Sequence, residues 1–350
     1  MTIVGLVLQG GGALGAFELG AIECLLDSDI RPDIVSGVSI GAINAATLCG
    51  HRDNDPKISL RNLWRDLTTM NMPFQPDLVN QNLSLLGCPG MYQPRSDYWD
   101  WIHWTSFYDT SPLLSTLETH VNFDKLGPSR QNFAPGDYTP RLILTATNIY
   151  TGKLETFDST EMAITPQHVR ASGSLPPGFP ATIAPAPPHS GGAEHLYWDG
   201  GLFDNTPLTR VIGALQEFDD PDKQLYVISL FPCAVTAAPT NMHEVFTRMM
   251  TLSFSHKMDQ DVKRAKKTTE LIRFTDELDQ AIDTHRDLEW LKDLSGYKVL
   301  KGFKVPLKIV EIVNPSVSGA SDFSAEGIER RREAGYQMTA AQLEMATSEQ

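Results

Sequence analysis

The stretch Ile34-Val35-Ser36-Gly37-Val38-Ser39-Ile40-Gly41-Ala42-Ile43 decides the fold of this chain. Its first residues are typical of a buried strand that ends in a sharp turn, and a helix is expected directly after Ser39. Gly37 and Gly41 lie two residues on either side of Ser39, which is the spacing of a nucleophile elbow, G-x-S-x-G. Glycine fits both positions because the strand and helix backbones come close at such a turn. The pattern indicates a serine nucleophile, although an ordinary strand-to-helix turn can share the same short signature.

A second glycine-rich turn precedes this one. The apolar run at residues 3–8 predicts a buried first strand, and Gly10-Gly11-Gly12-Ala13-Leu14-Gly15 follows it before a helix. In a parallel βαβ unit both turns lie at the same edge of the sheet, where ligands usually bind. One turn offers a hydroxyl group, and consecutive glycines offer backbone N–H groups that can surround an anion. This combination predicts a serine acyl-transfer site with an oxyanion hole.

The first glycine turn also fits a different class of site. Gly10 to Gly15 matches G-x-G-x-x-G, the fingerprint of dinucleotide-binding proteins. That fingerprint requires an acidic residue at the end of the second strand, where it binds the ribose. Here the second strand ends in Gly37-Val38-Ser39, and Asp33 stands at its beginning. A nucleotide site is therefore the weaker alternative.

Composition limits the classes of partner. The 350 residues suffice for one large domain or a domain with an extension, and 41% of them are hydrophobic. The net charge of −14 argues against binding of nucleic acid or anionic membranes, but it says little about neutral lipid surfaces. Four scattered cysteines, a short apolar start and the lack of long apolar runs favour a cytoplasmic protein. The cysteines are Cys24, Cys49, Cys88 and Cys233.

An irregular insertion is expected between residues 72 and 107, where prolines, glycines and aromatic residues dominate. Three of the six tryptophans lie between Trp99 and Trp104. The insertion can form a lid or an acyl-chain wall at the mouth of the active site. Alternatively, its aromatic side chains simply pack on the core.

The remaining chain alternates between predicted strands and helices. Strands are expected at 141–147, 153–157, 196–198, 224–230 and 305–313, and helices at 169–172, 242–274 and 324–345. The segment 242–274 forms either one long helix or two. A proline-rich loop is expected around residues 175–180.

Asp199 is the candidate base for Ser39, because none of the nine histidines lies in a recognisable motif. It follows a predicted strand and precedes Gly200 and Gly201, which let its backbone approach another turn closely. Burial beside a hydroxyl group raises the proton affinity of a carboxylate, so direct proton transfer from serine is feasible within hydrogen-bond reach. A plain β-turn is the alternative reading of Asp-Gly-Gly.

Four segments together resemble the patatin-like phospholipases. They are Gly10–Gly15, Gly37–Gly41, the stretch Ala171-Ser172…Pro176…Phe179-Pro180, and Asp199-Gly200-Gly201 with Asn205 and Pro207 behind it. The resemblance covers residues 3–215 and implies a three-layer α/β/α sandwich with a mostly parallel central sheet. It also divides the chain into a catalytic domain at 1–235 and a mostly helical C-terminal extension at 236–350, packed on it and similar to that of a bacterial subgroup.

The resemblance further implies a lipid acyl hydrolase that acts through a covalent acyl-enzyme. It assigns a Ser39–Asp199 dyad without histidine, an oxyanion hole from the amides of Gly10, Gly11 and Gly12, and no metal or other cofactor. We add the Ile40 amide as a further candidate donor. The supporting motif glycines are Gly15, Gly37, Gly41, Gly200 and Gly201.

The expected partner is a lipid or phospholipid, with peripheral contact to a membrane surface left open and no nucleic acid. Gly15 stands where many family members have arginine, so one phosphate contact is missing and the headgroup stays undetermined. A non-catalytic lipid- or acyl-binding module that retains the fold is the alternative function.

Overall fold

The structure is a computed structural model that describes residues 2–69, 83–128, 139–191, 193–218, 220, 222–232, 234, 238–240, 242–301, 307–316 and 319–348. Cys233, residues 72–82 of the expected insertion, and residues 305 and 306 of the last expected strand lie outside these ranges. Cys24, Cys49 and Cys88 are buried, and none of these three described cysteines forms a disulfide. No helix among the described residues has the length and apolar character needed to cross a membrane.

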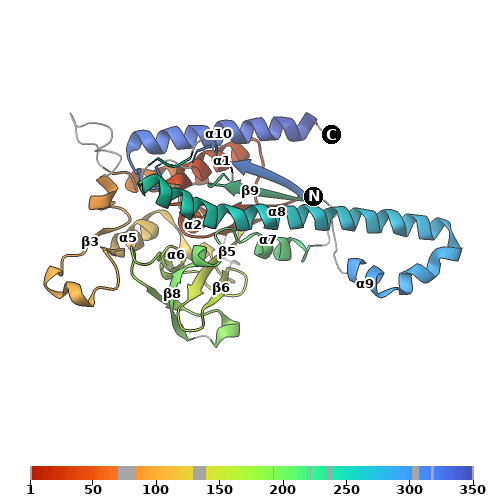
Figure 1. Cartoon of the computed structure of the whole chain (residues 1–350), viewed down its shortest axis with the longest axis horizontal. Helices are drawn as coiled ribbons and strands as arrows, with labels where there is room; N and C mark the ends of the chain where they lie inside the picture. Colours follow the sequence, from red (N-terminus) through yellow and green to blue (C-terminus); the bar gives the residue numbers. More distant parts are fainter. Residues whose placement is uncertain are drawn as a thin grey trace.

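A mostly parallel sheet forms the centre of the molecule (Figure 1). Its path is β10 (Lys308–Val313), β9 (Lys223–Ser229), β1 (Ile3–Leu8), β2 (Ile34–Gly37), β5 (Arg141–Asn148), β8 (Glu194–Asp199) and β7 (Thr182–Pro185), with β6 (Lys153–Asp158) paired to β5. The first five strands of this path run parallel, whereas β6 and β8 lie antiparallel to β5. Strand β7, which pairs antiparallel with β8, follows the proline-rich loop and is not predicted from the sequence.

Helices cover both faces of the sheet, which confirms the α/β/α arrangement. On β1, Leu6 and Leu8 pack into one hydrophobic core, while Ile3 and Val7 pack into another. Successive side chains of a strand point to opposite faces, so β1 is buried on both. The first face carries α1 (Gly15–Asp27), α2 (Ile40–Cys49), α3 (Pro56–Asp66), α5 (Ser111–His120), α6 (Pro166–Ser172) and α10 (Ala325–Ser348). The second carries α7 (Leu208–Leu215) and part of α8 (Met242–Thr284).

The C-terminal region contributes to all three layers. Helix α8 is one continuous helix of 43 residues, and its Met258 and Val262 are buried against the second face. Its far part extends away from the sheet towards η8 (Arg286–Asp293) and α9 (Ser295–Lys301) (Figure 1). Strand β10 then pairs with β9, and α10 lies beside α1. The domain boundary at residue 235 stays a prediction.

The described part of the insertion forms an arm at one end of the molecule (Figure 1). Its elements are η2 (Leu83–Leu86), the antiparallel pair β3 (Gln93–Pro94) and β4 (Tyr108–Asp109), and η3 (Tyr98–His103) between them. The Tyr92 side chain is buried and packs on the core, whereas Trp99 and Trp101 are exposed. The insertion therefore packs on the core at its base and projects at its tip.

Candidate active site

Ser39 occupies the turn between β2 and α2. Its φ of 56° lies in the left-handed region that non-glycine residues rarely adopt, as expected for a nucleophile elbow. A Cβ on Gly37 would lie 2.2 Å from the carbonyl oxygen of Gly41, and one on Gly41 would lie 2.7 Å from that of Leu8. Only glycine fits these positions without movement of the backbone. The predicted elbow geometry is therefore present.

Helix α6 holds the elbow from the other side. The Ser39 amide donates to both the carbonyl oxygen and the Oγ of Ser172, at 3.1 and 3.2 Å. Ser172 is buried at the C-terminal end of α6. This contact gives the Ala171-Ser172 segment a physical role, because it fixes the backbone from which the Ser39 hydroxyl projects.

Asp199 lies at the end of β8 and is 2% exposed. Burial raises the pKa of its carboxyl group to about 7. Hydrogen bonds from the Gly201 amide and the Ser39 side chain lower this pKa, but by less than burial raises it. The Gly201 amide is 2.7 Å from Asp199 Oδ1. A Cβ on Gly200 would lie 2.5 Å from the carbonyl oxygen of Thr145, so glycine lets this turn approach β5. The structure thus brings Ser39 and Asp199 together.

The glycine-rich turn after β1 lies beside Ser39. A Cβ on Gly10 would be only 3.0 Å from Ser39 Cβ. The Gly10 amide donates to the Asn205 carbonyl oxygen at 3.4 Å, and Asn205 Nδ2 donates to the Gly10 carbonyl oxygen at 2.9 Å. Among the described residues, the amides of Gly11 and Gly12 have no hydrogen-bond partner. The Gly10 amide is therefore engaged by Asn205, whereas within the described part of the chain those of Gly11 and Gly12 are not.

Two other motif residues have packing roles. A Cβ on Gly15 would lie 2.5 Å from Ile40 Cγ1, so glycine there allows α1 to pack against the start of α2. Asn205 links the Asp199 turn to the glycine turn, since its side chain also lies beside Gly201. Both residues support the relative positions of the candidate catalytic groups.

A buried polar network beneath the two turns is missed by the sequence reasoning. Glu18 on α1 is fully buried, and it accepts hydrogen bonds from the Gln9 amide at 2.7 Å and from Asn44 Nδ2 at 2.9 Å. Trp64 Nε1 donates to Asn44 Oδ1 at 2.8 Å. Burial raises the pKa of Glu18 well above its ordinary value. An acidic residue within an otherwise apolar helix is the signal that could have indicated this network.

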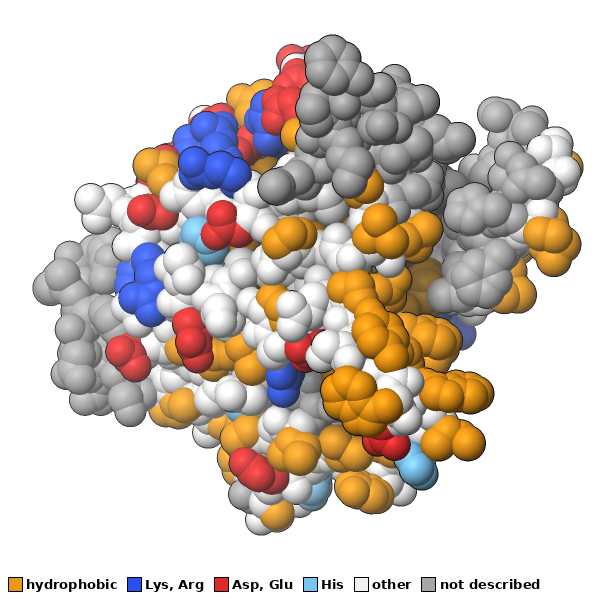
Figure 2. Space-filling view, turned by 90° about the vertical axis from the view of Figure 1, so that its left-hand side faces the viewer, with side chains coloured by type: hydrophobic (Ala, Val, Ile, Leu, Met, Phe, Trp, Pro, Cys, Tyr) orange, Lys and Arg blue, Asp and Glu red, His pale blue; other side chains and the backbone are white. Residues whose placement is uncertain are grey.

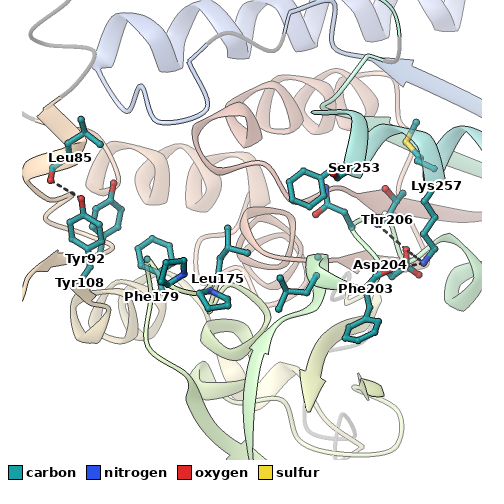
Figure 3. Close-up of a pocket in the computed structure, with 18 residues that line it drawn as sticks. Leu85, Tyr92, Tyr108, Leu175, Phe179, Phe203, Asp204, Thr206, Ser253 and Lys257 are labelled. Atoms are coloured by element: carbon teal, nitrogen blue, oxygen red, sulfur yellow. Dashed lines mark hydrogen bonds and ion pairs between the residues drawn. The ribbon is translucent and has the colours of Figure 1, made fainter. Parts of the chain in front are cut away.

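A cavity of about 660 Å³ borders the site (Figure 3). Gly201 and Asn205 connect it to the Asp199 and glycine turns. Its walls come from the insertion, from the proline-rich loop at 175–179 and from α8, and most of its lining side chains are apolar. Asp204 and Lys257 supply the charged groups among the lining residues, and they pair at 3.0 Å between Oδ1 and Nζ. The cavity therefore suits an uncharged, largely apolar group.

Comparisons with known proteins identify the family of the chain. The family model for patatin-like phospholipases matches residues 6–212, so the chain belongs to the patatin-like phospholipase family. The chain is 26% identical over 230 residues to triacylglycerol lipase 5 of Saccharomyces cerevisiae, a match that covers 59% of this chain and 27% of the lipase. It is 46% identical over 50 residues to neuropathy target esterase sws of Drosophila melanogaster, covering 14% of this chain and 4% of the esterase.

Solved structures show weaker likeness. VipD from Legionella pneumophila aligns with 99% of this chain and 67% of its own, at 17% identity and a TM-score of 0.44. Human GIVD cytosolic phospholipase A2 aligns with 46% of this chain and 23% of its own, at 21% identity and a TM-score of 0.29. The chain spans about a quarter or less of the length of the curated relatives it matches.

Proposed function

We propose that this protein is a serine ester hydrolase that cleaves acyl esters of lipids through Ser39 and Asp199. The observation that carries the proposal is the contact of the Ser39 hydroxyl, on a strained turn, with a buried carboxyl group whose pKa is about 7. A base with a pKa near neutral pH can both take and return a proton during one cycle. Family membership and the lipase and esterase relatives support the same class of reaction.

The first half of the reaction transfers the acyl group to the enzyme. Ser39 Oγ attacks the ester carbonyl carbon while Asp199 takes the hydroxyl proton. The carbonyl oxygen gains negative charge, and the amides of Gly11, Gly12 and Ile40 stabilise it. Gly10, which the resemblance also assigns to the oxyanion hole, acts mainly by holding the turn through Asn205. The bond to the alcohol oxygen then breaks, and Asp199 gives its proton to the leaving alcohol.

The second half releases the acyl group. Asp199 takes a proton from water, whose oxygen attacks the acyl carbon, and the proton returns to Ser39 Oγ as the acid leaves. Every proton moves between Asp199, Ser39, water and substrate, so the proposal includes no metal or other cofactor. The apolar cavity beside the turns takes an acyl chain, and contact with a lipid surface delivers the substrate.

Labelling with a fluorophosphonate probe tests the nucleophile. We expect the wild type to be labelled on Ser39, and Ser39→Ala and Asp199→Asn to lose labelling. Ser253→Ala is the matched control, because Ser253 lines the same cavity and its hydroxyl donates to the Met249 carbonyl oxygen. Mass spectrometry of the adduct identifies the modified serine.

The outcomes separate the proposal from its alternatives. Labelling that persists in Ser39→Ala means that another residue is the nucleophile. A wild type that stays unlabelled, also in the presence of lipid vesicles, but binds a fatty acid analogue supports the non-catalytic acyl-binding module instead.

A further inference from the structure

The described arm exposes an unusual number of large apolar side chains. We name residues 95–107 the aromatic arm. Within it Trp99 is 84% exposed, Trp101 69% and Ile102 74%, and Tyr98 and Phe107 are exposed as well. Single exposed apolar residues are common on protein surfaces, but a contiguous group of them usually marks an interaction site. Figure 2 shows hydrophobic side chains gathered in one continuous area at this end of the molecule, with few charged groups among them.

The exposure is built into the arm. Arg95 pairs with Asp97 and lies over the ring of Trp104, at 5.3 Å from its centroid. Trp104 Nε1 donates to the Asp97 carbonyl oxygen at 3.2 Å, and its ring lies 6.0 Å from that of Tyr98. These contacts occupy Trp104 and hold the short helix η3. Trp99, Trp101 and Ile102 are consequently presented outwards.

The base of the arm is attached to the wall of the cavity. The amides of Phe107 and Tyr108 donate to the carbonyl oxygens of Pro177 and Gly178, at 3.1 and 3.0 Å. Tyr108 Oη donates to the Leu85 carbonyl oxygen at 2.9 Å, and Figure 3 shows both residues at one end of the cavity. Leu85 is itself exposed and lines the cavity. The base of the arm is therefore attached directly to the wall of the cavity.

The chemistry of the arm fits a lipid–water interface. Tryptophan and tyrosine combine an apolar ring with a polar group, and they concentrate where hydrocarbon meets water. The aromatic arm contains one arginine against two aspartates, and the whole chain carries a net charge of −14. A surface of anionic lipid would repel such a protein, whereas a zwitterionic surface would not.

We propose that the aromatic arm is a docking surface for zwitterionic phospholipid bilayers, with Trp99, Trp101 and Ile102 entering the interface. This inference rests on the proposed lipid substrate, because docking there places the cavity next to the bilayer. It adds to the proposed function the surface that delivers the substrate.

Vesicle binding of the full chain tests the docking surface without turnover. The background is Ser39→Ala, and the arm variant carries Trp99→Ser, Trp101→Ser and Ile102→Ser in addition. We expect the partition coefficient of the arm variant into phosphatidylcholine vesicles to be at least about tenfold lower than that of its parent. Binding of the variant no longer transfers three apolar side chains from water into the bilayer interface. Trp290→Ser is the matched control, because Trp290 is 60% exposed on η8, far along α8 from the arm, and its loss should leave partition unchanged.

Several results would overturn the proposal. Equal partition of the arm variant and its parent would do so, and so would binding that requires anionic lipid in the vesicles. If the wild type sediments as a dimer and the arm variant as a monomer that still binds vesicles, the surface is a contact with a second copy of the chain. If the arm mediates binding but the wild type hydrolyses no ester, the docking surface stands and the proposed function fails.

With Ser39 restored, the arm variant separates docking from chemistry. We expect its kcat/KM for a soluble short-chain ester to stay within about twofold of wild type, while hydrolysis of vesicle lipid falls about tenfold. Equal losses on both substrates would show that the arm acts on the site itself, which contradicts docking as its role.

Discussion

Asp199 is a carboxyl group whose surroundings oppose its ionisation, and this property predicts the pH dependence of catalysis. Burial raises its pKa to about 7, and only the ionised form can accept the Ser39 proton. We therefore expect kcat/KM for a soluble ester to be constant above about pH 8 and to fall tenfold per pH unit below 7. A pH–rate profile of the wild type measures this. A profile that is flat between pH 5 and 8 would remove Asp199 from the role of base.

The same residue predicts a pH-dependent cost to stability. Its pKa is 3.8 in the unfolded chain and about 7 when folded, so the folded carboxyl group binds the proton more tightly. Its stabilising contribution is full below pH 3.8 and is lost as the pH rises through about 7. Asparagine stays neutral and can still accept the Gly201 amide. Asp199→Asn should therefore melt at a higher temperature than wild type at pH 8 and at a similar one at pH 4.

A surface carboxylate is the control for this comparison. The Asp29 side chain is 91% exposed, and Asp29→Asn should leave the melting temperature unchanged at both pH values. If Asp199→Asn is less stable than wild type at pH 8, the carboxylate is better stabilised in the folded protein than its burial indicates.

At the scale of elements, some of the structure could be predicted from local sequence. The apolar runs of β1 and β2 and the glycines after each strand predicted the parallel βαβ unit, because buried parallel strands and close turns leave strong local signals. Strand β7 was not predicted, because Ala184 and Pro185 are not typical strand residues and the strand forms by pairing with β8. The Glu18 network was not predicted either, because it also depends on contacts between distant parts of the sequence. Its partners lie on three different elements and meet only in the folded chain.

This network yields the prediction at the element scale. Glu18→Ala leaves two buried donors without their acceptor, the Gln9 amide and one N–H of Asn44 Nδ2, and each costs about 1–3 kcal/mol. Asn44 Nδ2 still donates to the Gly15 carbonyl oxygen at 3.0 Å. Because Gln9 directly precedes the glycine turn, we also expect kcat to fall. Trp64→Phe is the matched variant. It removes the donor to Asn44 Oδ1 and shrinks a fully buried ring, so it should cost about 1–3 kcal/mol of stability with little change in kcat. Denaturant unfolding and steady-state kinetics measure both quantities.

A different result would change the assignment. If Glu18→Ala and Trp64→Phe lower kcat equally, the network acts through α2 and the elbow rather than through the glycine turn.

At the scale of the whole molecule, the C-terminal region is joined to the rest by close backbone contacts. A Cβ on Gly20 of α1 would lie 1.7 Å from the Arg332 carbonyl oxygen, and one on Gly335 of α10 would lie 2.0 Å from that of Phe17. Beside this contact Arg332 pairs with the buried Glu23 at 2.7 Å. Helix α1 begins directly after the glycine turn. A shift of α10 would therefore move α1 and, with it, the glycine turn of the candidate site.

Gly335→Ala tests this dependence. The added methyl group meets backbone atoms, so the two helices must separate, and we expect the free energy of unfolding to fall by about 1–3 kcal/mol or more. Gly213→Ala is the matched control, because Gly213 lies in α7 with no atom within 4 Å of the added Cβ. Alanine in that helix should stabilise the protein by about 0.5–1 kcal/mol.

Thermal unfolding and fluorophosphonate labelling of the two variants decide between two organisations of the chain. If α10 is integral to the folded unit, Gly335→Ala shows a single transition at lower temperature, and labelling is lost in that same transition. If residues 236–350 are an extension that packs on an independent catalytic domain, Gly335→Ala shows an early transition that leaves labelling of Ser39 intact. We expect the single transition, because β10 pairs along its whole length with β9 and α10 covers α1 on the same sheet.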